Sequence, residues 1–389
     1  MYSYMVPSTG YLTKYNVLYY KGMIILQYPR ADQQGEIPDF VEEKTYEQTL
    51  LNASEWGKKV GSLTVDDINN NVLTDAKSFI KKCEERHENL INEIVEDIYN
   101  KQIIKLIAIA GPSSSGKTTF SNKLREGLEK KGIYPVKISM DDYYLDRSGL
   151  TPEEEKNIDY EDINLIDIPL FNKHLKELTE GREVTLPYFD FISKTRKVGK
   201  TIKLDKNSPI IIEGIHALNN KLTESLDRKN KYEIYIGPHI QINLDNHNPI
   251  SITHLRLIRR MVRDYKFRGS DVSRTLSMWD SVRRGEFKWI YENQEGVDFV
   301  YNSVYYLFYK FTKFIKNYQK SVKQKVYITR QECQSCFIYA LRSWIKILFH
   351  TLSSRTLIKY FKYFVDIEDE DVPERSLLRE FIGGSCFKE

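Results

Sequence analysis

One short run of residues constrains this chain more than any other feature, the sequence G-P-S-S-S-G-K-T from Gly111 to Thr118. It follows the apolar run Ile103 to Ala110 and opens a helical pattern. A strand, a loop with the spacing G-x-x-x-x-G-K-[ST] and a helix together form a phosphate-binding loop. The glycines let backbone N–H groups surround phosphate oxygens, and the helix presents its positive end to the same anion. We therefore predict that this chain binds a nucleoside triphosphate.

The side chains of this loop have separate expected roles. Lys117 would bring a positive charge to the transferred phosphate, and the Thr118 hydroxyl would bind Mg²⁺. A serine-rich turn that matches by accident is the alternative, which the strand and helix on either side disfavour. The residues predicted to contact the nucleotide are Gly111, Ser113, Ser114, Ser115, Gly116, Lys117, Thr118 and Thr119.

Length and composition set the class of protein. The 389 residues are enough for two domains, and 41% hydrophobic with 29% charged residues is typical of a water-soluble globular chain. Four cysteines do not make a disulfide framework, so a reducing, cytoplasmic location is expected. The N-terminus has no secretory signal pattern, and no uncharged apolar run is long enough to predict a membrane span.

Charge is distributed unevenly and divides the chain. Residues 301–364 contain 12 Lys or Arg and one acid, Glu332, so this stretch carries +11. Because the whole chain carries +4, the rest carries −7. We predict three parts: an N-terminal α+β segment at 1–100, a central α/β domain at 101–302, and a basic, aromatic, helical tail at 303–389.

The N-terminal part is predicted to contain a hairpin and a long helix. Tyr11 to Tyr28 is rich in strand-forming residues around Lys21-Gly22, which indicates two strands and a turn. Apolar residues from Val72 to Ile98 recur at three- and four-residue spacing, as on one face of a helix. Cys83 and His87 lie one turn apart on that face. A buried structural pair is the favoured interpretation over metal ligation, because no second ligand pair is evident.

The central block alternates short apolar runs with helical patterns, as in a parallel sheet covered by helices. Ligands of such sheets bind beyond the carboxyl ends of the strands, so acids at those ends are candidate site residues. Glu213 ends one strand and fits a Mg²⁺ ligand, although it could simply cap a turn. Asp141 and Asp142 follow another, and spacing alone does not decide which accepts a proton from an attacking hydroxyl. The expected strands are Leu106 to Ala110, Val136 to Ser139, Ile210 to Ile212 and Glu233 to Ile236.

Four arginines share one predicted helix face at Arg256, Arg259, Arg260 and Arg263. Like charges at this spacing repel, which favours a polyanionic partner such as nucleotide phosphates under a mobile lid. The alternative is a solvated basic face compensated by Asp264. A nucleic-acid partner is not needed to explain this pattern.

Several motifs in order resemble the uridine kinase and phosphoribulokinase family of phosphate-loop kinases, and more narrowly its bacterial nucleoside kinase-like members. The resemblance runs from Ile107 to about Asn302. It implies a P-loop kinase core with a parallel sheet wrapped by helices. It also implies ATP or GTP as phosphoryl donor, Mg²⁺ as cofactor and a nucleoside acceptor. Besides the loop, the matching motifs are Ser139-Met140-Asp141-Asp142-Tyr143-Tyr144, Asn157-Ile158-Asp159, Pro187-Tyr188-Phe189-Asp190-Phe191, Ile212-Glu213-Gly214-Ile215 and Arg256 to Asp264.

The resemblance also implies roles for individual residues. It selects Asp141 as the base toward a sugar 5′-hydroxyl, and it matches Asp159 to the acid that holds the ribose hydroxyls. Two departures concern base recognition: Phe189 and Lys194 stand where pyrimidine nucleoside kinases carry a tyrosine and a histidine. The implied catalytic residues are Asp141, Lys117, Arg259 and Arg263. The metal ligands are Thr118, Glu213 and Asp141, and the substrate residues are Asp159, Tyr144, Phe189, Asp190, Lys194 and Arg256.

Both ends of the chain carry further resemblances. Residues 1–100 resemble the stretch that precedes the kinase in longer bacterial relatives, whose modules similar to the N-terminal domains of threonyl-tRNA synthetase are not in this sequence. Tyr363 to Phe387 resembles the family's ending, whereas about 305–352 does not, which suggests a frameshift or a diverged insert. Within that run, Cys333 and Cys336 are weak evidence for zinc or redox work. Phe337 to Leu352 allows a surface-lying amphipathic helix.

The sequence thus leads to one main hypothesis and two alternatives. The main hypothesis is an ATP-dependent kinase that phosphorylates a small-molecule hydroxyl, most simply the 5′-OH of a nucleoside. One alternative is a sugar-phosphate kinase similar to phosphoribulokinase, since Lys194 would suit a phosphorylated acceptor. The other is a nucleotide-binding or RNA-associated regulator without catalysis. The sequence leaves a homo-oligomer open.

Overall fold

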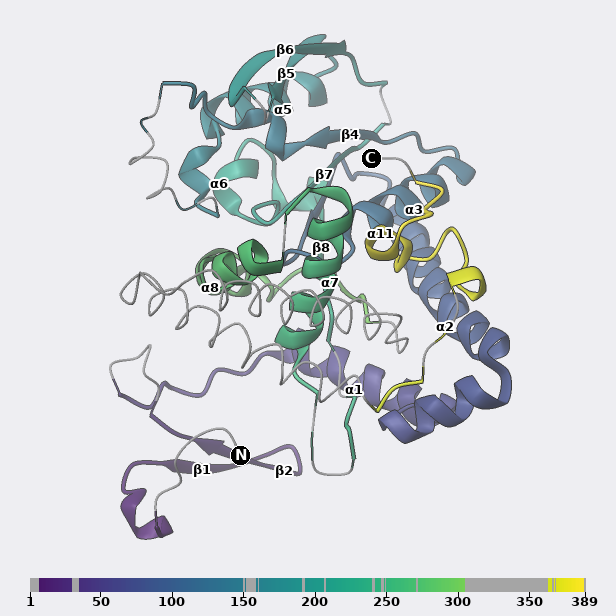
Figure 1. The fold of residues 1–389 in the computed structure, drawn as a ribbon. Coiled ribbons are helices and arrows are strands. Elements are labelled where there is room, and N and C mark those ends of the chain that lie inside the picture. Colours follow the sequence, from purple (N-terminus) through teal and green to yellow (C-terminus); the bar gives the residue numbers. More distant parts are fainter. Residues whose placement is uncertain are drawn as a thin grey trace, which may run out of the picture. The chain divides into compact units, whose positions relative to one another are not determined.

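The apolar run before the phosphate-binding loop forms the central strand of a parallel sheet (Figure 1). This computed structural model describes residues 7–29, 35–149, 151, 159, 161–190, 193–205, 208–239, 242–245, 248, 250–270, 272–304, 363–365, 367 and 369–387. The predictions for Cys333, Cys336, the run 305–352 and Asn157-Ile158 lie outside the described residues.

The first compact unit, Met1–Lys44, contains the predicted hairpin. Strands β1 (Asn16–Tyr20) and β2 (Met23–Gln27) pair antiparallel, with Tyr20 opposite Met23. The two turn residues, Lys21 and Gly22, have φ of 47° and 82°, which is the conformation that tight hairpins need. A short 3₁₀ helix, η1 (Thr9–Tyr11), precedes the hairpin.

The second unit, Thr45–Glu389, holds the five-stranded sheet in the order β4-β7-β3-β8-β9. All neighbours in this sheet are parallel. The four strands predicted from sequence are confirmed, and a fifth, β9, was missed. The sheet strands are β3 (Leu106–Ala110), β4 (Val136–Ser139), β7 (Ile210–Gly214), β8 (Lys231–Gly237) and β9 (Phe299–Asn302).

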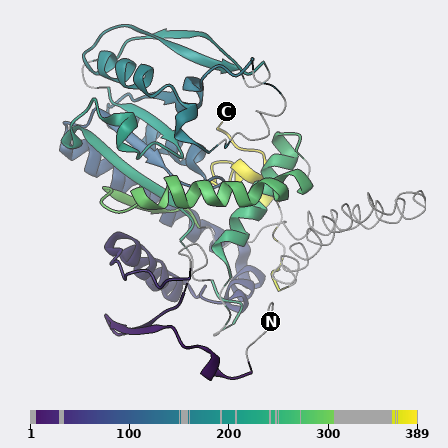
Figure 2. The ribbon, with the colours of Figure 1, turned by 90° about the vertical axis from the view of Figure 1, so that its left-hand side faces the viewer.

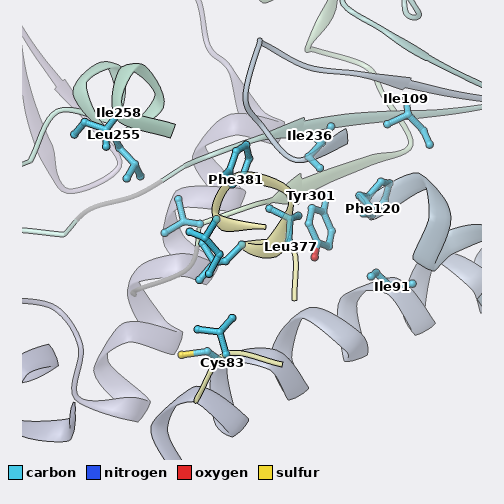
Figure 3. Close-up of a cluster of buried hydrophobic side chains, with 14 of the residues drawn as sticks. Cys83, Ile91, Ile109, Phe120, Ile236, Leu255, Ile258, Tyr301, Leu377 and Phe381 are labelled. Carbon is cyan, nitrogen blue, oxygen red and sulfur yellow. The ribbon is translucent and has the colours of Figure 1, made fainter. Parts of the chain in front are cut away.

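Helices cover both faces of this sheet, because its strands are apolar on both sides. On β3, Ile107 and Ile109 join one buried cluster, whereas Leu106, Ala108 and Ala110 join the other. Figure 3 shows part of the first cluster. The longer helices are α1 (Lys44–Val60), α2 (Val65–Lys101), α3 (Lys117–Lys130), α5 (Ile168–Thr179), α7 (Ile252–Phe267) and α8 (Val272–Trp289).

The predicted amphipathic helix is α2, which begins at a capping box formed by Thr64 and Asp67. Cys83 and His87 are both buried on its core face. The His87 ring bonds the Tyr301 hydroxyl at 2.7 Å and the Val304 carbonyl at 3.2 Å, so the structural interpretation is confirmed. Burial raises the pKa of Cys83 to about 12, which keeps the thiol protonated.

The remaining elements are short or belong to a second hairpin. Strands β5 (Val184–Asp190) and β6 (Thr195–Ile202) form a separate antiparallel pair that the sequence did not predict. Other short elements are η3 (Met140–Tyr143), η4 (Ile163–Leu165), α6 (Asn220–Thr223), η5 (Arg228–Asn230), η6 (Tyr291–Asn293), η7 (Asp369–Asp371) and α11 (Arg379–Ile382). The boundaries predicted near residues 100 and 302 stay predictions about domains. The two compact units instead separate at residue 44.

Candidate active site

The phosphate-binding loop connects β3 to α3 and has the backbone of an anion cradle. Ser114 and Gly116 have φ of 61° and 93°, the left-handed conformation in which successive N–H groups form a concave nest. A Cβ atom on Gly111 would lie 2.0 Å from the carbonyl oxygen of Ile236, so only glycine fits there. The buried hydroxyls of Ser114 and Ser115 have no hydrogen-bond partner among the described residues. This donor set fits the phosphates of a nucleotide.

Lys117 extends along this loop. Its ammonium group donates to the carbonyls of Gly111 at 2.9 Å and Pro112 at 3.2 Å. Burial lowers the pKa of Lys117, and the carboxylates of Glu213 and Glu380 oppose that change. The two loop carbonyls and the two carboxylates thus favour the charged form of Lys117.

The strand register brings the predicted acids to the loop. Glu213, at the end of β7, lies opposite Ile109 of β3 and Ser139 of β4. The Thr118 hydroxyl donates to Glu213 Oε1 at 3.4 Å, and Glu213 Oε2 is buried with no partner in the described part of the chain. An unsatisfied carboxylate oxygen beside a hydroxyl fits the oxygen ligands that Mg²⁺ prefers.

Asp141 and Asp142, which the spacing could not separate, have different surroundings. Asp142 accepts a hydrogen bond from the Phe189 amide at 3.3 Å, so it holds strand β5. Asp141 is exposed to solvent, although Met140 before it is buried. Loss of part of its hydration, with the nearby Glu213 charge, raises the pKa of Asp141, and the Lys117 charge opposes this change. The charges of Lys117 and Glu213 both act on Asp141, which is an electrostatic setting found around general bases.

The residues implied for the acceptor lie around β5 and the turn after it. Phe189 is buried and meets the Tyr144 ring edge-on at 5.7 Å, with the Arg147 guanidinium over both rings. Asp190 pairs with Lys197 at 2.5 Å. With its ring inside the protein, Phe189 offers no open stacking face in this structure. Its role at a nucleobase stays a prediction.

Two other implied acceptor residues make local contacts. Asp159 Oδ1 accepts from the Glu161 amide at 3.2 Å, which orders the turn before η4. Lys194 has φ of 58° in the turn between β5 and β6, and its carbonyl accepts from the Arg147 amide at 3.0 Å. Both contacts fix the backbone, and the substrate roles of these side chains stay predictions.

The arginine face of α7 is buried and its charges have partners inside the chain. Arg256 pairs with Glu286 of α8, and both side chains are 1% exposed. Arg263 and Arg260 pair with Asp264. The compensation by Asp264 that the sequence left as an alternative is therefore present, and repulsion alone no longer requires a polyanion.

The same helix contacts the phosphate-binding loop directly. Arg256 donates to the Ser113 carbonyl at 3.2 Å, and Arg260 donates to the Ser113 hydroxyl at 2.8 Å. Arg259 lies farther along, with its guanidinium 3.4 Å from the Ser303 carbonyl. Two of the four arginines thus touch the nucleotide loop, while the catalytic roles of Arg259 and Arg263 stay predictions.

Three charged residues lie near the loop that the sequence did not predict as site residues. Lys137 of β4 lies 2.6 Å from Glu213 Oε1. Glu286 balances Arg256, and Glu380 accepts from the Thr119 amide at 3.1 Å. The family-like ending around Glu380 was a usable signal for the third. The other two had none, because their partners are far away in sequence.

The central part of this chain is similar to a known protein family and to several characterised kinases. The family described as Phosphoribulokinase / Uridine kinase matches residues 106–305, just over half of the chain. The chain belongs to this family. A uridine kinase of Staphylococcus haemolyticus is 34% identical over 178 residues, which is 46% of this chain and 76% of that protein. Uridine kinases of Staphylococcus aureus strains are 34% identical over 180 residues, 46% of this chain and 77% of theirs.

Solved structures also match parts of this chain. They include a possible uridine kinase from Bacillus stearothermophilus, 21% identical over 51% of this chain and 88% of that chain, with a TM-score of 0.30. Phosphoribulokinase from Rhodobacter spheroides is 14% identical over 49% of this chain and 67% of that chain, with a TM-score of 0.34.

Family membership makes this chain an ATP-dependent kinase with a nucleotide-binding phosphate loop. Within the described residues, no helix is both long and apolar enough to cross a membrane. No group of three or more potential metal-binding His, Cys, Asp or Glu side chains occurs among them either. A Mg²⁺ ion held by Thr118, Glu213 and nucleotide phosphates needs no such group.

Proposed function

We propose that this kinase transfers the γ-phosphoryl group of ATP to the 5′-hydroxyl of a nucleoside. One observation supports the proposal: strands β3, β4 and β7 end side by side, and the charges of Lys117 and Glu213 both act on Asp141. The similarity to uridine kinases supports a nucleoside as the acceptor.

In this mechanism the protein positions reactants and neutralises charge. The N–H groups of the loop and the Lys117 ammonium bind phosphate oxygens. Asp141 accepts the proton of the acceptor hydroxyl, and its raised pKa brings its basicity closer to what this step requires. Thr118 and Glu213 would hold Mg²⁺, which supplies further positive charge at the phosphates when bound.

An acceptor screen tests this function. The purified full chain is incubated with ATP, Mg²⁺ and, separately, uridine, cytidine, adenosine, guanosine or ribulose 5-phosphate. We expect ADP release that depends on a nucleoside, and a 5′-monophosphate product identified by ³¹P NMR. Preference for ribulose 5-phosphate would replace the proposal with the sugar-phosphate kinase, and no acceptor-dependent ADP release would reject both.

Neighbouring aspartates provide matched variants. Asp141→Asn should lower kcat by about 10²- to 10⁴-fold, because the base is lost. Asp142→Asn keeps an oxygen that accepts from the Phe189 amide, so it should change kcat far less. Equal losses in the two variants would contradict the assignment of Asp141.

A further inference from the structure

The C-terminal segment, residues 369–387, reaches the first turn of the phosphate-loop helix. Glu380 Oε2 accepts a hydrogen bond from the backbone amide of Thr119 at 3.1 Å. Thr119 follows Lys117 and Thr118 at the start of α3, where phosphate-loop proteins offer N–H groups to nucleotide phosphates. A protein carboxylate therefore holds a donor that a phosphate oxygen would use.

Packing fixes the position of this carboxylate. Leu377 lies against Gly116, since a Cβ atom on that glycine would come within 2.4 Å of the leucine side chain. Leu377 and Phe381 are both buried in the cluster drawn in Figure 3, close to Tyr301 and Phe120. Glu380 lies between these two anchors in sequence, so its side chain is held at the loop by the fold of the segment.

The same segment touches the arginine helix. The Arg259 guanidinium lies 5.3 Å from the centre of the Phe381 ring, and Lys266 donates to the Ile382 carbonyl at 2.7 Å. Both ribbon views show the C-terminal residues, in yellow, beside α7 (Figure 1 and Figure 2). Displacement of the segment from the loop would thus disturb contacts made by α7.

Charge makes the arrangement unfavourable for a bound triphosphate. The negative charges of Glu213 and Glu380 both favour the charged form of the loop lysine, Lys117. Burial, with the Glu213 charge, raises the pKa of Glu380, while the bond from Thr119 opposes that change. A triphosphate would bring several more negative charges to the same lysine and amides. The negative charges of the phosphates and of the two carboxylates would repel one another strongly.

We propose that Glu380 is a further residue of the nucleotide site, a built-in competitor that occupies the Thr119 amide until a nucleotide phosphate displaces it. The inference depends on the proposed function only in that the loop binds a nucleotide. Displacement of Glu380 would release the C-terminal segment from the loop and loosen its contacts with α7. The free energy needed to release the segment would therefore weaken the binding of every nucleotide.

Calorimetric titration with ADP and with inorganic tripolyphosphate tests the competition without turnover. In Glu380→Gln the amide oxygen can still accept from Thr119, so only the charge is removed. We expect both ligands to bind at least about fivefold more tightly than to the wild type, the scale of typical coupling between sites. The matched control is Glu374→Gln, an exposed acid of the same segment, which should leave both affinities unchanged.

Adenosine, which has no phosphate, should bind the wild type and Glu380→Gln equally. Weaker or unchanged binding of ADP and tripolyphosphate by Glu380→Gln would overturn the proposal, as would the absence of binding by both proteins. If the wild type binds ADP as described but no acceptor is phosphorylated, the proposed function fails while the competition stands.

Hydrogen exchange on the wild type gives a second readout that does not require a folded variant. Saturating tripolyphosphate should increase exchange at the amides of residues 376–382, because the segment is displaced. Protection of these amides on ligand binding would mean that the segment closes over the ligand, which would overturn the proposal.

Discussion

The ammonium group of Lys137 lies 2.6 Å from Glu213 Oε1, the carboxylate oxygen that also accepts from the Thr118 hydroxyl at 3.4 Å. The lysine therefore supplies the positive charge at the position where Mg²⁺ is proposed to bind. Metal binding would require this ion pair to open or to share its carboxylate. The ion pair would therefore couple the stability of the protein to Mg²⁺ binding.

Replacing Lys137 should make stability depend more strongly on Mg²⁺. In Lys137→Met the largely buried Glu213 carboxylate loses its ion-pair partner, and we expect the free energy of unfolding to fall by about 1–3 kcal/mol without metal. Thermal melts with and without Mg²⁺ and ADP should show a larger Tm gain for the variant than for the wild type. Lys131→Met removes a solvent-exposed ion pair to Glu96 and serves as the control. Equal gains in all three proteins would contradict this role.

Gly111 should not tolerate a methyl group. In Gly111→Ala the new Cβ would overlap the Ile236 carbonyl, so the loop or β8 must shift, at a cost of about 1–3 kcal/mol or more. We expect a lower Tm and loss of ADP binding in calorimetry. Gly149→Ala, whose Cβ would meet nothing within 4 Å, should match the wild type in both measurements. Normal ADP binding by Gly111→Ala would show that this loop is not the nucleotide site.

His87 should make the protein sensitive to acid. Burial lowers the pKa of His87 from 6.5 to about 3, so below pH 6.5 the unfolded chain takes up a proton that the folded protein does not. Stability contributed by neutral His87 is complete above pH 6.5 and is lost as pH falls toward 3, by about 2 kcal/mol at pH 5. Denaturant unfolding at pH 7.5 and pH 5 measures this loss. His87→Gln should reduce the difference by about that amount, whereas an unchanged difference would assign the effect to other groups.

The ionised Asp141 carboxylate should lower the stability of the folded protein at neutral pH. Because the folded state raises its pKa, the folded protein keeps this proton to higher pH than the unfolded chain. Stability therefore falls as pH rises from 3.8 through the folded pKa and stays reduced above it. Asp141→Asn should have a higher Tm than the wild type at pH 8, with the difference shrinking toward pH 4. A lower Tm at pH 8 would mean that the charged form is stabilised by its neighbours.

Local patterns in the sequence were sufficient for much of the fold. The phosphate-binding loop, the strand before it and the helix after it were predicted because turn glycines and apolar runs act over a few residues. The acids at strand ends could be predicted as site residues, because parallel strands all end at one edge of the sheet. Strand β9 was missed because its four residues are followed closely by an aromatic run, so no local pattern marks them as a separate strand.

The partners of the charged residues required the tertiary structure. The spacing of Arg256 and Arg260 gave a helix face but not Glu286 or Ser113, which come to that face from other parts of the chain. Glu380 lies 261 residues from Thr119 in sequence, so no local pattern could pair them. The sequence by itself determined which chemistry is present, through the loop and the acids. The tertiary structure alone decided which charges neutralise one another, because electrostatic energy depends on distance in space and not on separation along the chain.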